Sequence, residues 1–124
     1  MYSPQVLDHF EHPRNPGVVS FPDAEAQVEN PVCGDVLKLT ARISQGCIAE
    51  IKFLVKGCVP AMACGSALVE FLEGKTIAEA SDLKREDLIR RLGGLPEASG
   101  HAGHLAMDAL AALIRNAGKY RDRT

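Results

Sequence analysis

The sequence lacks several features that mark targeted, membrane-bound or redox proteins. No apolar run approaches the roughly 20 residues that span a bilayer, and the first residues carry no apolar signal core. Like charges do not cluster and the net charge is −2, which favours neither nucleic acid nor an anionic membrane as a partner. The cysteines form no CxxC pair, which excludes a zinc ribbon or a thioredoxin-like motif. We therefore expect a cytoplasmic protein with no nucleic-acid or membrane partner.

What the sequence does contain is the composition of a globular domain. Apolar residues make up 46% and charged residues 24%, so a length of 124 residues predicts one domain, 1–124, with a single core. In a cytosolic chain of this size, four cysteines indicate metal or thiol chemistry more than a disulfide framework. They are Cys33, Cys47, Cys58 and Cys64.

The stretch 51–75 predicts a strand that runs directly into a helix, with Cys58 at the junction. Ile51, Phe53 and Val55 alternate with polar or exposed positions, and Gly57 breaks the strand. Apolar residues at helical spacing follow from about residue 60, and Gly74 fits the end of the helix. Free N–H groups at a helix start lower a thiol pKa. We therefore expect Cys58 to favour the thiolate, although a free cysteine is more often a small core residue.

The remaining pattern predicts an α+β fold in which a small antiparallel sheet of about three strands packs against several helices. Strands 36–43 and 48–55 form a hairpin around Ser44-Gln45-Gly46, while 18–30 is a loop or a weak edge strand. A first helix over 2–11 begins at Ser3 and presents Val6, Leu7 and Phe10 as its apolar face. Later helices are expected over 76–80, from 81 or 82 to 91, and over 101–117 with Gly118 as the stop.

Two further motifs carry groups that bind metals. Cys33-Gly34-Asp35 places a thiol and a carboxylate about a glycine, although a plain turn with a buried cysteine explains it equally well. His101 and His104 share one face of a helix start with Asp108, and a solvated polar face is the simpler explanation for them. Imidazole and thiolate together suit zinc and iron. Cys47 is expected in a strand and Cys64 in the core.

These motifs occur in the order and spacing of a known family. The chain resembles the IscU family, the NifU N-terminal-type (SufE/NifU-like) scaffolds for iron–sulfur cluster assembly. The resemblance runs almost end to end, through Tyr2-Ser3, the segments 6–10 and 12–17 (HPRNPG), Cys33-Gly34-Asp35, Gly57-Cys58, Glu73-Gly74-Lys75, Leu95-Pro96, His101 and the segment 105–109.

The resemblance implies a scaffold or carrier rather than an enzyme. It implies that a [2Fe–2S] cluster is assembled from iron and from sulfur delivered by a cysteine desulfurase, and is then passed to acceptor apoproteins. It also implies that Cys33, Asp35, Cys58 and His101 bind the cluster or metal. A homo-oligomer in which two chains share a cluster stays open.

One position departs from the family. The family has a third cysteine, a cluster ligand, directly after the histidine, and this chain has Ala102. We therefore expect a ligand set of Cys33, Cys58, His101 and either His104 or Asp35, which suits Zn²⁺, iron or one end of a cluster. The alternative function is a zinc- or iron-binding divergent homologue that acts as a sulfur-relay or regulatory partner of a cysteine desulfurase. A plain interaction domain without metal is the third reading.

Overall fold

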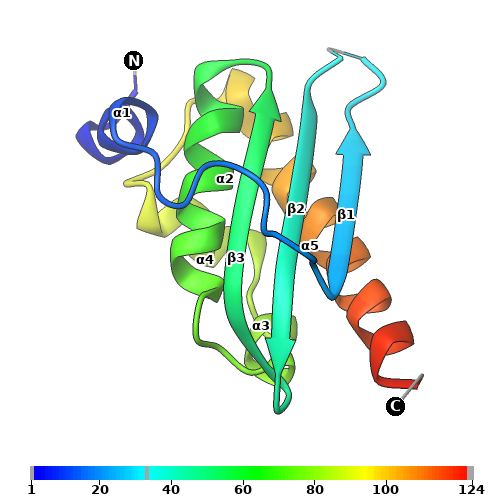
Figure 1. The fold of residues 1–124 in the computed structure, drawn as a ribbon. Helices are drawn as coiled ribbons and strands as arrows, with labels where there is room; N and C mark the ends of the chain where they lie inside the picture. Colours follow the sequence, from blue (N-terminus) through cyan, green and yellow to red (C-terminus); the bar gives the residue numbers. More distant parts are fainter. Residues whose placement is uncertain (1, 33, 123–124) are drawn as a thin grey trace.

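The structure, a computed structural model, describes residues 2–32 and 34–122, and it confirms the predicted α+β class (Figure 1). Three strands form one sheet, and helices both precede and follow it. In chain order the elements are α1 (Pro4–Glu11), β1 (Ala24–Glu29), β2 (Val36–Ser44), β3 (Cys47–Lys56), α2 (Val59–Leu72), α3 (Ile77–Ser81), α4 (Arg85–Arg91), the 3₁₀ turn η1 (Glu97–Ser99) and α5 (Gly100–Asp122).

The sheet is antiparallel with the order β1-β2-β3. The predicted β2–β3 hairpin is present, and its two turn residues, Gln45 and Gly46, have φ of 52° and 76°, as a type I′ turn requires. The segment expected as a loop or weak edge strand does form the edge strand β1. A bulge between Arg42 and Ile43 shifts the β2–β3 register by one residue, so that Val36 pairs with Lys56 at the far end of the hairpin.

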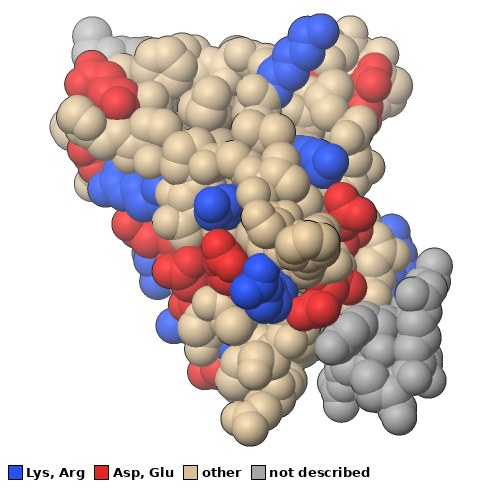
Figure 2. All heavy atoms as spheres, viewed as in Figure 1, with Lys and Arg blue, Asp and Glu red and all other residues tan. Residues whose placement is uncertain are grey.

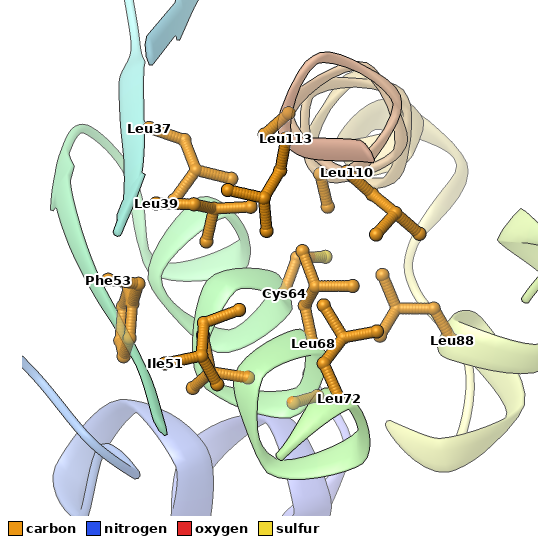
Figure 3. Packing of buried hydrophobic residues seen from close by; sticks show 14 of the residues in the cluster. Leu37, Leu39, Ile51, Phe53, Cys64, Leu68, Leu72, Leu88, Leu110 and Leu113 are labelled. Atoms are coloured by element: carbon orange, nitrogen blue, oxygen red, sulfur yellow. The ribbon is translucent and has the colours of Figure 1, made fainter. Parts of the chain in front are cut away.

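Two helices cover one face of the sheet, α2 over β3 and α5 over β1 and β2 (Figure 1). Leucine and phenylalanine side chains from both layers meet between them (Figure 3). The central helix α2 is apolar nearly all round because it lies between the sheet, α1, α4 and α5. Cys64, predicted to be a core residue, is fully buried in this layer.

The segment 12–23 crosses the opposite face of the sheet, from α1 to the start of β1 (Figure 1). It first pairs with the outer edge of β3, where backbone hydrogen bonds join Asn15 and Gly17 to Phe53, at 3.1 and 2.9 Å, around a parallel bridge at Pro16. Further along, the Val19 N–H donates to the Thr40 hydroxyl at 2.9 Å, which satisfies a threonine that is only 1% exposed. The HPRNPG motif therefore begins a strap: the motif itself pairs with the outer edge of β3, and the residues after it cover the second face of the sheet.

Three sequence expectations about helices are wrong. The helix expected from 81 or 82 begins only at Arg85, because Ser81 ends the preceding helix α3. In α1 the face toward α2 carries Val6 and His9, whereas Leu7 and Phe10 are each 42% exposed, because α2 offers His9 a hydroxyl partner at Ser66. In the last helix Gly118 does not end α5, which continues to Asp122. A glycine inside a helix costs about 1 kcal/mol, and burial of the preceding turn against β1 outweighs that cost.

The surface in the view of Figure 1 mixes charges of both signs (Figure 2). Lys38 pairs with Glu25, and Glu50 lies within 4.0 Å of both Arg42 and Lys52. Exposed pairs of this kind contribute little to stability. Within residues 2–32 and 34–122, no helix has both the length and the apolar character needed to cross a membrane.

Candidate metal centre

Three chain segments end or begin at the same end of the sheet, where β2 starts, β3 ends and α5 starts (Figure 1). Asp35 immediately precedes β2, Cys58 lies between β3 and α2, and His101 is in the first turn of α5. Cys58 is also the N-cap residue of α2, with extended backbone and no side-chain capping bond. The fold thus brings together three side chains that are up to 66 residues apart in sequence.

The three side chains converge on one point. The Cys58 thiol donates to Asp35 Oδ2 at 3.1 Å, Cys58 Sγ lies 3.7 Å from His101 Nε2, and His101 Nε2 lies 3.9 Å from Asp35 Oδ2. One ligand atom from each lies within 4.8 Å of the others, and among the described residues this is the one such group of His, Cys, Asp or Glu. The Asp35 side chain is 11% exposed and that of His101 is 35% exposed. The site therefore opens to solvent at the histidine.

These separations fit a single metal better than a proton relay. Bonds of about 2.3 Å to sulfur and about 2.0 Å to nitrogen at tetrahedral angles place the two ligand atoms about 3.5 Å apart, close to the 3.7 Å between Cys58 and His101. A thiol–imidazole–carboxylate relay needs the carboxylate on the other ring nitrogen. Here Asp35 and Cys58 both face Nε2. The arrangement is suited to coordination and not to nucleophilic catalysis of the triad type.

The expectation that Cys58 has a lowered pKa is wrong for the metal-free site. Burial raises the pKa of the Cys58 thiol, and the hydrogen bond to the Asp35 carboxylate raises it further. The N–H of Ala61 at the start of α2 acts in the expected direction, toward a lower pKa, but is outweighed. Without metal, the site therefore keeps a proton on Cys58.

The other predicted residues lie as follows. Cys33 is outside the described residues. His104 does not belong to the group of Asp35, Cys58 and His101. His104 and Asp108 are both exposed, as expected of a solvated helix face. Ala102, at the family's third cysteine position, is 1% exposed and belongs to the core cluster.

The prediction for Cys47 is confirmed, whereas the interpretation of Gly57 was incomplete. Cys47 is in strand β3, as predicted. Gly57 was interpreted only as a strand break, yet it lies against the Asp35 carboxylate. The strand pattern alone gives no signal for this contact, which depends on the register shift at the bulge.

The fold and the site together define a class, namely a small α+β domain that presents a mixed sulfur, oxygen and nitrogen site at one end of a three-stranded sheet. Comparison with known families is consistent with this class. The NifU-like N terminal domain family matches residues 1–124, and the chain belongs to it.

Relatives of the chain carry descriptive names. It is 42% identical over 114 residues to the iron–sulfur cluster assembly scaffold protein IscU 1 of Archaeoglobus fulgidus, covering 92% of this chain and 74% of that one. It is 37% identical over 119 residues to the iron–sulfur cluster assembly scaffold protein IscU of Azotobacter vinelandii, covering 93% and 92%. Both relatives are named as scaffolds, not as enzymes.

Solved structures share the fold. A nitrogen-fixing NifU-like protein (N-terminal) from Brucella abortus superposes with a TM-score of 0.79 at 18% identity, over 94% of each chain. An iron–sulfur cluster assembly scaffold protein for the SUF system from Fervidobacterium islandicum, described as putative, gives 0.74 at 18% identity, over 91% of this chain and 96% of that one. At these identities the likeness establishes the fold alone.

Proposed function

We propose that this chain is a scaffold for iron–sulfur cluster assembly. In this role it binds iron and sulfur at one site, holds a [2Fe–2S] cluster and passes that cluster to acceptor apoproteins. The observation that carries the proposal is the convergence of Asp35, Cys58 and His101 on one point, in a chain whose relatives are named scaffolds. We propose a cysteine desulfurase as the sulfur donor.

The ligand set that we propose is Cys33, Asp35, Cys58 and His101. Two candidates compete for the oxygen or nitrogen position beside the thiolates, Asp35 and His104. Asp35 Oδ2 lies 3.1 Å from Cys58 Sγ, whereas His104 is exposed and outside the group. These observations favour Asp35. Cys33 is two residues before Asp35 and supplies the second thiolate in this proposal.

The residues support release as well as capture of the cargo. Binding of iron displaces the proton that Cys58 shares with Asp35, because thiolate is the metal ligand. A single carboxylate oxygen binds iron more weakly than a thiolate does, so Asp35 provides a ligand that is readily exchanged when the cluster leaves. His101 is more exposed than Asp35, at 35% against 11% of the side chain, and provides a side of the site that an acceptor can reach.

Sulfur transfer to the scaffold follows from the same groups. The Cys58 or Cys33 thiol gives up its proton, which the leaving desulfurase sulfur accepts, and attacks as thiolate the outer sulfur of a desulfurase persulfide. A new sulfur–sulfur bond forms on the scaffold while the desulfurase thiolate leaves, so no external oxidant or reductant is consumed in this step. Cys58 is partly exposed, as this attack requires.

A second candidate function is favoured by Ala102. A methyl group binds neither metal nor sulfur, and its position is buried in the core. A chain without the third thiolate is suited to holding one zinc or iron ion as a sulfur-relay or regulatory partner of a desulfurase. Zinc, iron and cluster are therefore the three cargoes to distinguish.

Four variants, Cys58→Ser, His101→Ala, His104→Ala and Asp35→Ala, test the proposed ligand set. Metal bound per chain is measured after anaerobic loading with Fe²⁺ and, separately, Zn²⁺, followed by desalting. We expect Cys58→Ser and His101→Ala to lose most of the bound metal and His104→Ala, the matched exposed histidine, to retain it. Loss of metal in His104→Ala with retention in Asp35→Ala would instead establish His104 as the ligand.

A further inference from the structure

The position taken by the Asp35 carboxylate is the space that a side chain at residue 57 would occupy. An ideal Cβ built on Gly57 lies 2.5 Å from Asp35 Cγ and 2.7 and 2.9 Å from its two carboxylate oxygens. Real Cβ atoms essentially never approach other atoms to less than 3.0 Å. All three nearest atoms belong to Asp35, so any other residue at 57 would have to displace that carboxylate.

Space, and not backbone conformation, is what position 57 requires. Gly17, Gly34, Gly46, Gly74, Gly93 and Gly94 have φ between 70° and 125°, where glycine is favoured, but Gly57 is not among the positive-φ glycines. An alanine at 57 is therefore compatible with the local backbone.

The sheet register explains why the two residues meet. The last β2–β3 pair is Val36 with Lys56, and continuing the antiparallel ladder by one step places Asp35 beside Gly57. The carboxylate then extends past Gly57 to the neighbouring Cys58, whose thiol it binds at 3.1 Å. Because the Asp35 side chain is 11% exposed and held in this position, it has little freedom to move aside without leaving Cys58.

We propose that Gly57 is a positioning residue for the metal centre, which keeps Asp35 within coordinating distance of the cargo by leaving room for its carboxylate. This role rests on the proposed metal-binding function. A Cβ at residue 57 separates Asp35 from Cys58 and His101, and it removes the oxygen ligand while the three other proposed ligands remain. Gly57→Ala is thus expected to mimic the loss of the Asp35 ligand.

A double-mutant cycle tests this role. The proteins are the wild type, Gly57→Ala, Asp35→Ala and the double variant, with Gly118→Ala as the matched control, because Gly118 has no atom within 4 Å of an added Cβ and no positive φ. The probe is Co²⁺, read by its thiolate charge-transfer and ligand-field absorption and by its dissociation constant. Urea unfolding of the metal-free proteins is measured in parallel.

We expect Gly57→Ala and Asp35→Ala each to weaken Co²⁺ binding by about ten-fold or more and to give the same altered ligand-field spectrum. In the double variant the two losses of affinity should not add. Gly57→Ala should lower stability in the wild type and have little effect once Asp35 is alanine, because the colliding atoms are gone. If Gly57→Ala alone fails to fold, folding of the double variant supports the proposal.

Three results would overturn the proposal. The first is that Gly57→Ala destabilises the wild type and the Asp35→Ala protein equally. The second is that the Co²⁺ spectrum of Gly57→Ala matches the wild type while that of Asp35→Ala differs. The third is that the double variant is as unfolded as Gly57→Ala alone. A wild type that binds no Co²⁺ would contradict the proposed function instead. The unfolding cycle would then still decide whether Gly57 places Asp35.

Discussion

Ser66 on α2 is the residue whose loss gives the most direct test of how the HPRNPG strap is held. It is fully buried, and its hydroxyl serves two groups from outside the helix. The backbone N–H of Arg14 donates to Ser66 Oγ at 2.9 Å, and the same Oγ lies 2.7 Å from His9 Nδ1. His9 Nε2 faces the Glu70 carboxylate at 3.8 Å, so we assign the ring proton to Nε2. Nδ1 of the neutral ring is then the acceptor, and the Ser66 hydroxyl donates to it while accepting from Arg14.

Ser66→Ala removes both bonds at once and leaves two groups without a partner. An unsatisfied buried donor or acceptor costs about 1–3 kcal/mol. The His9 nitrogen is buried and the Arg14 N–H only partly so, which places the sum at about 2–4 kcal/mol. Since small domains have about 5–15 kcal/mol of stability, the loss is a large fraction of the total.

Urea unfolding measures this loss. With a slope of about 2 kcal/mol per molar for a domain of this size, we expect the midpoint of Ser66→Ala to fall by about 1–2 M. The matched control is Ser81→Ala, which removes an exposed hydroxyl bonded to the Ile77 carbonyl at 2.9 Å and should change stability by less than about 0.5 kcal/mol. A Ser66→Ala midpoint no lower than that of Ser81→Ala would refute the reasoning.

Two further predictions follow from buried titratable groups. Burial and the nearby Arg14 charge hold the pKa of His9 below its usual 6.5, so the stability that neutral His9 contributes should be fully present above about pH 6.5 and be lost as the pH falls through the folded-state pKa. Urea midpoints from pH 7.5 to 5 should therefore decrease, and His9→Gln should flatten this dependence. An unchanged dependence in His9→Gln would contradict the assignment. Burial raises the pKa of Cys64 to about 12, so iodoacetamide at pH 8 should label Cys64 only in urea, whereas the partly exposed Cys47 should react in the native protein. Mass spectrometry identifies the labelled peptides, and label on Cys64 without urea would contradict its burial in α2.

Much of the fold could be predicted from local signals. The Ser3 cap, the type I′ hairpin turn and the Thr76 capping box act over a few residues, and the structure contains all of them. The α1 face was wrong because the choice between Phe10 and His9 depended on Ser66, which is 56 and 57 residues away in the chain. A polar partner in α2 changed which side of the helix is buried.

The sequence indicated three residues that the fold brings together, but it did not indicate how they meet. Asp35, Cys58 and His101 were found by motif and resemblance, and the fold brings them together. The bulge at Arg42 and Ile43 could not be predicted, since it depends on the whole hairpin, and it determines that Asp35 meets Gly57. The raised pKa of Cys58 was missed because its larger cause, burial of the thiol, and the hydrogen bond to Asp35 both depend on how distant segments pack together.

The measurement that tests the central claim most directly is anaerobic reconstitution with ferrous iron, cysteine and a cysteine desulfurase. Visible absorption is then recorded and iron and acid-labile sulfide are determined after desalting, with Cys58→Ser as the control. A scaffold should give a stable chromophore with iron and sulfide in equal amounts, and the control should not. A colourless protein that retains a single zinc or iron ion would contradict the account and leave the metal-bound partner of a desulfurase as the function.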